Sequence, residues 1–147
     1  MTTIAVSRTQ IAGDRQANHN GGLKFKIKSK IYSFSNSDFY KYSFHIGLAG
    51  NVDTFPEVIA FFLDPSNVEK TPKLKGGEGI ILSEDGKIWT FADPSKWLYI
   101  DQPYYAIGTG MNFAMGAMSA GATPYEAVKY AEKLDPQTGM GVTKIDI

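Results

Sequence analysis

Residues 1–14 read MTTIAVSRTQIAGD. Two short apolar runs, residues 3–6 and 11–13, are separated by a brief and mostly polar span. Runs of this length around such a span predict two strands joined by a tight hairpin. Thr2 immediately precedes the first strand of this hairpin, and Asp14 follows the second apolar run.

Downstream of the hairpin, further strands are separated by loops rich in glycine and polar residues. Alternation of apolar and polar residues predicts strands over 23–32, 39–48, 80–82, 88–91, 104–107 and 140–147. The segments between 80–82 and 88–91 form a second hairpin. Loops are expected over 15–22, 33–38 and 66–79, where turn-forming and polar residues gather.

Three helices are expected, each from local signals. Thr54 and Glu57 have capping-box spacing, and Asp64 before a proline ends the helix they begin. Its apolar stripe consists of Phe55, Val58, Ile59, Phe62 and Leu63. Residues 111–120, rich in Ala, Met and Gly, predict a closely packed second helix. A capping box of Thr123 and Glu126 begins the third, whose apolar face consists of Ala127, Val128, Ala131 and Leu134.

The order of these elements is strands, one helix, strands, two helices and a final strand. This order is neither the alternation of a parallel sheet nor an all-β pattern. It indicates an α+β fold with two layers of mainly antiparallel sheet and helices outside them. A chain of 147 residues and 16.1 kDa is expected to form a single domain over residues 1–147.

The composition excludes several classes of protein. The 15 Lys and Arg residues balance the 15 Asp and Glu residues, whereas a nucleic-acid binder or a membrane-surface module needs a basic surplus. The absence of cysteine rules out disulfides and a cysteine nucleophile, and two histidines exclude a His-rich metal site. We therefore expect no metal and no cofactor. No leader and no run of about 20 apolar residues is present, so a cytoplasmic location is expected.

The lysines of residues 24–30 occupy every second position of a predicted strand. Lys24, Lys26, Lys28 and Lys30 alternate with the apolar Leu23, Phe25, Ile27 and Ile31. Successive side chains of a strand point to opposite faces, so this pattern predicts one solvated lysine face, above all for Lys24 and Lys26.

Familiar phosphate and nucleophile motifs are missing. The sequence contains no Gly-x-Ser-x-Gly elbow and no Walker-type loop. Gly108-Thr109-Gly110 lies between a strand and a helix, as a dinucleotide loop would. Phe113 occupies the place of the third glycine, and no βαβ unit follows, so a ligand-binding module of that kind is disfavoured.

Thr2 is the most suggestive residue for chemistry. A methionine before a small residue is normally removed, which would leave Thr2 with a free α-amine. The reference pKa of such an amine is roughly 7.7–8.0, so part of it is neutral near pH 7 and can accept the proton of its own hydroxyl. A neighbouring lysine would lower the pKa of that amine by like-charge repulsion, and a carboxylate would hold the lysine in place.

The sequence resembles the proteasome β-subunit family and is most similar to its bacterial HslV-type peptidases. The resemblance spans nearly the whole chain and rests on short segments in the family's order: the N-terminal 2–4 and 11–17, the pair 30–31, the pair 49–50, residues 105–114, and the turn 135–139. It implies an N-terminal-nucleophile hydrolase with a four-layer αββα sandwich. It also implies a threonine peptidase that acts on peptides or unfolded proteins. The peptidase would assemble as a homo-oligomer, for which a ring is one arrangement.

The same resemblance implies roles for particular residues. Thr2 would be the nucleophile and its amine the base, Lys30 would tune the amine, and Asp14 would orient Lys30. The backbone N–H of Gly50 would face the developing oxyanion. The polar support around the amine would come from Thr109, Asp135 and Thr138. Singly, each of these residues also has an ordinary structural explanation, such as a turn or a helix stop.

A substrate side-chain pocket is implied near Lys28, together with Ala17, Leu48 and Val52. Lys28 lies two residues before Lys30 and shares its strand face, so a two-residue register shift would exchange their roles. If Lys30 is the catalytic lysine, a lysine at position 28 would favour an acidic or polar residue before the scissile bond.

Two departures from the family lead to an alternative. The first hairpin is shorter than the family's, and one helix and a loop replace the family's two helices between Gly50 and Ile80. In the family that layer contributes contacts between stacked rings, so regulation by an ATPase unfoldase cannot be assumed. The alternative is a catalytically silent subunit with a structural or assembly role, in which Met1 is retained.

Overall fold

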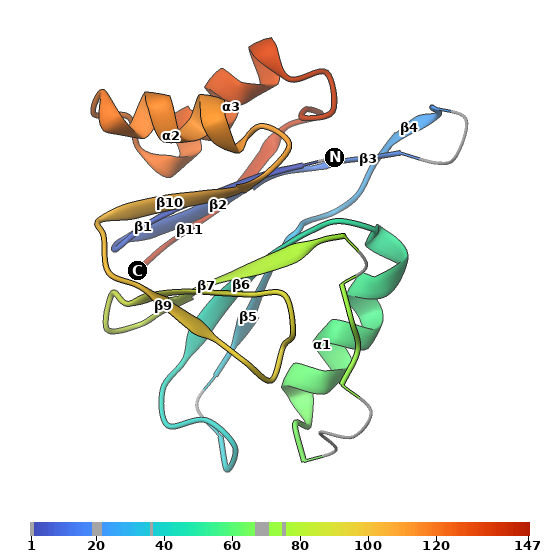
Figure 1. Ribbon diagram of the computed structural model, residues 1–147, viewed down its shortest axis with the longest axis vertical. Coiled ribbons are helices and arrows are strands. Elements are labelled where there is room, and N and C mark those ends of the chain that lie inside the picture. The colour runs from blue at the N-terminus through green and yellow to red at the C-terminus, as the bar shows by residue number, and fades with distance from the viewer. Residues whose placement is uncertain (1, 19–21, 36, 67–70, 75) are drawn as a thin grey trace.

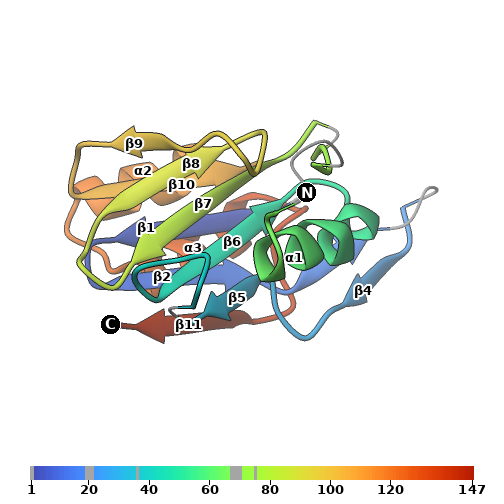
Figure 2. The ribbon, with the colours of Figure 1, turned by 90° about the horizontal axis from the view of Figure 1, so that it is seen from below.

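The computed structural model describes residues 2–18, 22–35, 37–66, 71–74 and 76–147. Two antiparallel sheets dominate the molecule (Figures 1 and 2). The first has the order β10-β1-β2-β11, with the bounds Tyr104–Gly108, Thr3–Ser7, Gln10–Asp14 and Val142–Asp146. The second has the order β5-β6-β7-β8-β9, with the bounds Ile31–Phe34, Phe44–Ala49, Glu78–Ser83, Ile88–Phe91 and Leu98–Ile100.

The remaining elements are a small ribbon and the helices. The strands β3 and β4 pair as a two-stranded ribbon, with the bounds Gln16–Asn18 and Lys24–Lys26. The helices are the 3₁₀ turn η1 and the α-helices α1, α2 and α3, with the bounds Val52–Thr54, Phe55–Leu63, Met111–Ser119 and Pro124–Leu134. No helix in the described ranges is long and apolar enough to cross a membrane.

The elements stack in layers, which Figure 1 shows from α2 and α3 at the top, through the first and second sheets, to α1 below. Small residues let α2 and α3 lie close to the first sheet, and they include Ala5, Ala12, Ala106 and Ala114. Branched aliphatic side chains fill the space between the sheets, including Ile4, Ile11, Ile80, Leu82 and Ile107. Aromatic side chains fill the space under α1, including Phe34, Phe44, Phe62 and Phe91. The α+β class with mainly antiparallel sheets and outer helices is therefore confirmed.

Both predicted hairpins are present. β1 pairs with β2 in the register Ile4↔Gly13, and β7 pairs with β8. The expected capping box of α3 is formed as well. Thr123 Oγ1 accepts from the backbone N–H of Glu126 at 3.2 Å, and Glu126 Oε1 accepts from the backbone N–H of Thr123 at 3.0 Å. These features depend on neighbours in sequence, which explains why the sequence alone predicts them.

The strand predicted over residues 23–32 is wrong, because the structure divides it between two sheets. β4 pairs with β3, inside the expected loop 15–22, whereas β5 pairs with β6 and continues into the expected turn 33–38. The division also breaks the predicted lysine face. Lys24, Lys26 and Lys28 are exposed, but Lys30 is 1% exposed.

Smaller differences concern ends of elements. β6 begins at Phe44 rather than at residue 39, and the short edge strand β9 has no predicted counterpart. Thr54 makes no side-chain cap for α1, because its hydroxyl donates instead to the carbonyl of Asn51 at 2.6 Å. Leu63 and Leu134, predicted on apolar faces, are 65% and 49% exposed, since each is the last residue of its helix.

Candidate active site

The hairpin register brings Thr2 to Asp14. Ile4 lies opposite Gly13, so the two residues before Ile4 run alongside Asp14 at the end of β2. The Thr2 hydroxyl donates to Asp14 Oδ1, which also accepts from the backbone N–H of Thr3 at 3.1 Å. Both residues are buried, with Thr2 1% and Asp14 0% exposed. A polar pair this deep requires further hydrogen-bond partners.

Lys30 supplies the third member of this group from the residue before β5. Its Nζ donates to Thr2 Oγ1, to Asp14 Oδ1 at 2.9 Å and to the carbonyl of Gln16 at 2.5 Å. Burial lowers the pKa of Lys30, and the neighbouring Asp14 carboxylate opposes this shift. The Thr2 hydroxyl therefore donates a hydrogen bond to the Asp14 carboxylate and accepts one from the Lys30 ammonium.

Asp14 also links this group to the end of the domain. Its second oxygen, Oδ2, accepts from the backbone N–H of Gln16 at 3.3 Å and of Gly139 at 3.1 Å. Four protein groups besides Lys30 thus donate to this carboxylate, the Thr2 hydroxyl and three backbone N–H groups. Hydrogen bonds of this kind fix the orientation of the side chain.

A second polar cluster lies on the other side of Thr2. Asp135 Oδ2 accepts from the hydroxyls of Thr109 at 2.6 Å and Thr138 at 2.7 Å. The Thr109 hydroxyl oxygen lies 3.3 Å from the Thr2 nitrogen, which donates to it. Burial alone would raise the pKa of the Asp135 carboxyl, but the hydrogen bonds from Thr109, Thr138 and the Gln137 backbone outweigh it and lower that pKa. Asp135 follows α3 as a helix stop and also orients the surroundings of the Thr2 nitrogen.

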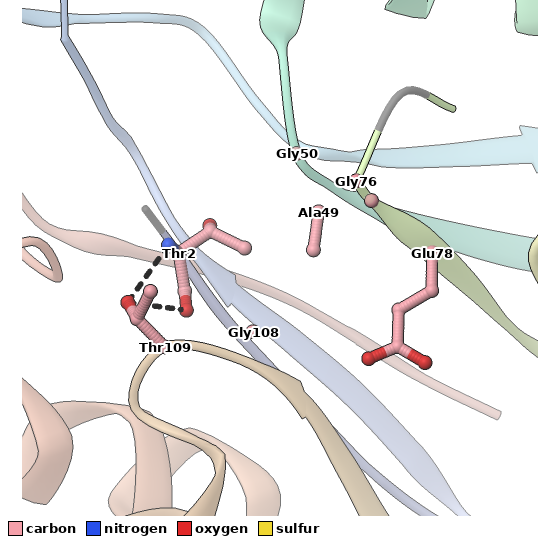
Figure 3. A pocket seen from close by; sticks show the side chains of 8 residues that line it. Thr2, Ala49, Gly50, Gly76, Glu78, Gly108 and Thr109 are labelled. Atoms are coloured by element: carbon pink, nitrogen blue, oxygen red, sulfur yellow. Dashed lines mark hydrogen bonds between the residues drawn. The ribbon is translucent and has the colours of Figure 1, made fainter. Parts of the chain in front are cut away.

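Thr2 lines a cavity of about 220 Å³ (Figure 3). Gly50 and Gly77 form one part of its wall, and Gly108 forms another. Gly50 has φ +125°, and a Cβ there would lie 2.8 Å from the Cα of Gly77. A Cβ at Gly108 would lie 2.1 Å from the Thr2 carbonyl oxygen. Glycine at position 108 therefore allows the backbone to approach Thr2 closely, and glycine at position 50 allows it to approach Gly77.

The structure brings the seven predicted catalytic residues into one region. Thr2, Asp14 and Lys30 form the first cluster, Thr109, Asp135 and Thr138 form the second, and Gly50 lines the shared cavity. Sequence reasoning missed Glu78, which lines the same cavity. Its position in the run Gly76-Gly77-Glu78-Gly79 was the available signal, since such a run lets backbone segments approach closely.

The four predicted substrate contacts divide into two pairs. Lys28 and Val52 line a separate cavity of about 670 Å³ beside α1, whose wall includes Tyr32 and Phe55. Ala17 and Leu48 are 3% and 0% exposed. Lys28 lies two residues before Lys30, and Val52 lies two residues after Gly50. Residues that line this larger cavity are therefore close in sequence to residues of the candidate site.

No metal centre is evident in the described part of the chain, where no three His, Asp or Glu side chains gather closely enough to hold an ion.

No family model matches the sequence, and no curated protein sequence does either. Solved structures, in contrast, match almost the whole chain. HslV from Trypanosoma brucei is 18% identical, with 98% of both chains covered and a TM-score of 0.69. BPH from Thiobacillus denitrificans, solved in complex with epoxomicin, is 18% identical, with 99% of this chain and 97% of that chain covered and a TM-score of 0.67.

A third solved structure has a larger chain. The Gly-1 mutant of Anbu from Hyphomicrobium sp. strain MC1 is 11% identical and has a TM-score of 0.74. The match covers 100% of this chain and 82% of the Anbu chain. The protein therefore has the fold of HslV, BPH and Anbu, and at these identities the likeness establishes the fold alone.

Proposed function

We propose that this protein is a threonine peptidase of the proteasome and HslV type, with Thr2 as its nucleophile once Met1 is removed. One observation carries the proposal: the buried Thr2 hydroxyl lies between the Lys30 ammonium and the Asp14 carboxylate at the wall of a cavity. A hydroxyl in a solvated turn would have no need of a buried lysine, which is costly to desolvate.

The reaction proceeds through an acyl-enzyme. Removal of Met1 frees the Thr2 amine, which takes the hydroxyl proton while Thr2 Oγ1 forms a bond to the carbonyl carbon of the substrate. The peptide C–N bond then breaks, and the proton passes from the Thr2 amine to the leaving amine. Water hydrolyses the resulting ester, and its proton restores the Thr2 hydroxyl.

Surrounding groups support these steps. The Lys30 charge lowers the pKa of the Thr2 amine, so that more of it is neutral and able to accept a proton. Thr109, held by Asp135, positions the amine nitrogen 3.3 Å away. The backbone N–H of Gly50 donates to the oxyanion, and one such donor is typically worth about 10²–10³ in rate.

The proposal extends to assembly. We assign the layers to the αββα sandwich of N-terminal-nucleophile hydrolases, with the outer layer beside the second sheet reduced to α1. A homo-oligomer agrees with the helical assembly of Anbu from Pseudomonas aeruginosa, whose chain has the same fold with a TM-score of 0.71. Unfolded protein as substrate, an ATPase unfoldase as partner and a cytoplasmic location belong to the same proposal.

Substrate preference before the scissile bond is expected to follow Lys28. Its exposed ammonium lines the larger cavity with Val52, so an acidic or polar side chain is favoured there over an aliphatic one. Matched peptides with Glu or Leu before the scissile bond check this, and about a fivefold preference for Glu is expected for one exposed ion pair. A strong preference for Leu would contradict the assignment of Lys28 to the substrate pocket.

The rival proposal is a silent subunit in which Met1 is retained and the Thr2 nitrogen stays in a peptide bond. Intact-mass measurement on protein from the native host separates the two, because catalysis requires loss of the Met1 mass. Incubation with epoxomicin, the ligand of the similar BPH structure, is then expected to add one inhibitor mass per chain. Retained Met1 together with no labelling would favour the silent subunit.

A further inference from the structure

Glu78 occupies a position of β7 at which the alternation of the strand predicts an apolar residue. It is the first residue of β7 and pairs with Ala49 of β6. Side chains of a strand alternate between faces, so Glu78 shares its face with Ile80 and Leu82. Both of these are 0% exposed and belong to the core between the two sheets. Glu78 therefore places a carboxylate at the end of a row of apolar side chains that fills the space between the sheets.

That end of the inter-sheet space is the cavity that Thr2 lines. Figure 3 shows the Glu78 side chain extending from β7, on the far side of Ala49 from Thr2. The other described residues that line this cavity are glycines, an alanine and threonines, so among the described residues Glu78 alone gives this wall an ionisable side chain. A substrate group that enters this cavity beside Thr2 can therefore reach the carboxylate of Glu78.

Among the described residues, the carboxylate of Glu78 also has no partner. Glu78 is half-buried, and within the described residues its side chain makes no hydrogen bond and no ion pair. Burial raises the pKa of its carboxyl. A partly desolvated carboxylate without a partner is unfavourable, and an incoming cation would remove that cost.

We propose that Glu78 binds a cationic group of the substrate next to the scissile bond, namely the side chain of a lysine or an arginine. The inference rests on the proposed function, because it places this basic residue beside the Thr2 nucleophile. Lys28 lines the other cavity and has the opposite charge, so Glu78 addresses a different substrate residue from the one that Lys28 faces.

Hydrolysis tests the inference with an isosteric variant. Internally quenched peptides carry either lysine or its uncharged analogue norleucine at each position around the scissile bond. For wild-type protein, one position is expected to show about a tenfold higher kcat/KM with lysine, as for a charged hydrogen bond in a half-buried site. Glu78→Gln is expected to abolish that difference, so that kcat/KM becomes the same for the lysine and the norleucine peptide. Glu78→Lys is expected to reverse the difference.

The matched control is Asp101→Asn, which removes the same charge at an exposed position between β9 and β10. It is expected to keep the wild-type preference for lysine, which excludes an effect of net charge alone. An unchanged lysine preference in Glu78→Gln, or none in wild-type protein that does cleave peptides, would overturn the inference.

A binding measurement keeps this inference separate from the peptidase proposal. In Thr2→Ala protein, which needs no turnover, the side-chain carboxyl of Glu78 is followed by ¹³C NMR as the lysine or the norleucine peptide is added. A shift with the lysine peptide only supports the role of Glu78, even if wild-type protein hydrolyses nothing. The same response to both peptides, or no response to either, counts against it.

Discussion

Replacing Thr2 by alanine is expected to abolish peptide hydrolysis, with kcat reduced at least about 10⁴-fold, as for other nucleophiles of acyl transfer. The substitution removes the oxygen that would form the acyl bond, and no other hydroxyl lies between Lys30 and Asp14 among the described residues. Lys30 and Asp14 still form their ion pair at 2.9 Å, so the free energy of unfolding should fall by only about 1 kcal/mol. Hydrolysis of a fluorogenic peptide and urea unfolding measure both quantities.

Two control variants sharpen this result. Thr9→Ala removes an exposed hydroxyl from the β1–β2 turn and should retain full activity. Thr2→Ser keeps a terminal hydroxyl and amine, and it should retain a measurable part of the rate. Unchanged turnover in Thr2→Ala, with Met1 shown to be absent from the wild-type chain, would rule out Thr2 as the nucleophile.

Replacing Lys30 by methionine is expected to have the largest effect on stability. Lys30 is one of the largest fully buried side chains, and its ammonium neutralises a carboxylate that is 0% exposed. Removal of one partner from a buried ion pair leaves the other uncompensated, at a cost of about 3–5 kcal/mol. Urea unfolding of Lys30→Met should show this loss, and kcat should fall about 10³-fold because the Thr2 amine, the proposed base, loses the cation that lowers its pKa.

The double variant Lys30→Met with Asp14→Asn separates the two effects. It removes both charges, so it should be less destabilised than the sum of the single variants, which is the sign of a direct interaction. Hydrolysis should nevertheless remain lost. Recovery of activity along with stability would show that Lys30 has only a structural role, whereas strict additivity of the two unfolding energies would contradict the pair itself.

Prediction from sequence worked where the signal was local. The β1–β2 hairpin and the capping box of Thr123 and Glu126 depend on residues a few positions apart, and both are present. The strand predicted over residues 23–32 failed because its alternation continued unbroken across a point where the chain leaves the β3–β4 ribbon for the second sheet. Nothing in the alternation marks that point, since sheet membership depends on distant partners.

Lys28 and Lys30 also show that local alternation does not predict which sheet or core a residue joins. Lys28 and Lys30 share one pattern in the sequence, yet Lys28 is exposed and Lys30 is buried against Thr2 and Asp14. The resemblance to the proteasome family favoured Lys30 as the catalytic lysine, but the two-residue spacing left the alternative open. Only the course of the chain between β4 and β5 separates the surroundings of the two side chains.

The sequence alone was enough to predict the β1–β2 and β7–β8 hairpins, the three helices, the cap of α3 and the threonine after Met1, because each depends on short-range periodicity or residue identity. The tertiary structure decided which groups surround that threonine. Asp14 arrives through the hairpin register, Lys30 through a break between two sheets, and Glu78 through its place at the end of β7. These are long-range pairings, and the energetic reason for them is the burial of two sheet faces against each other.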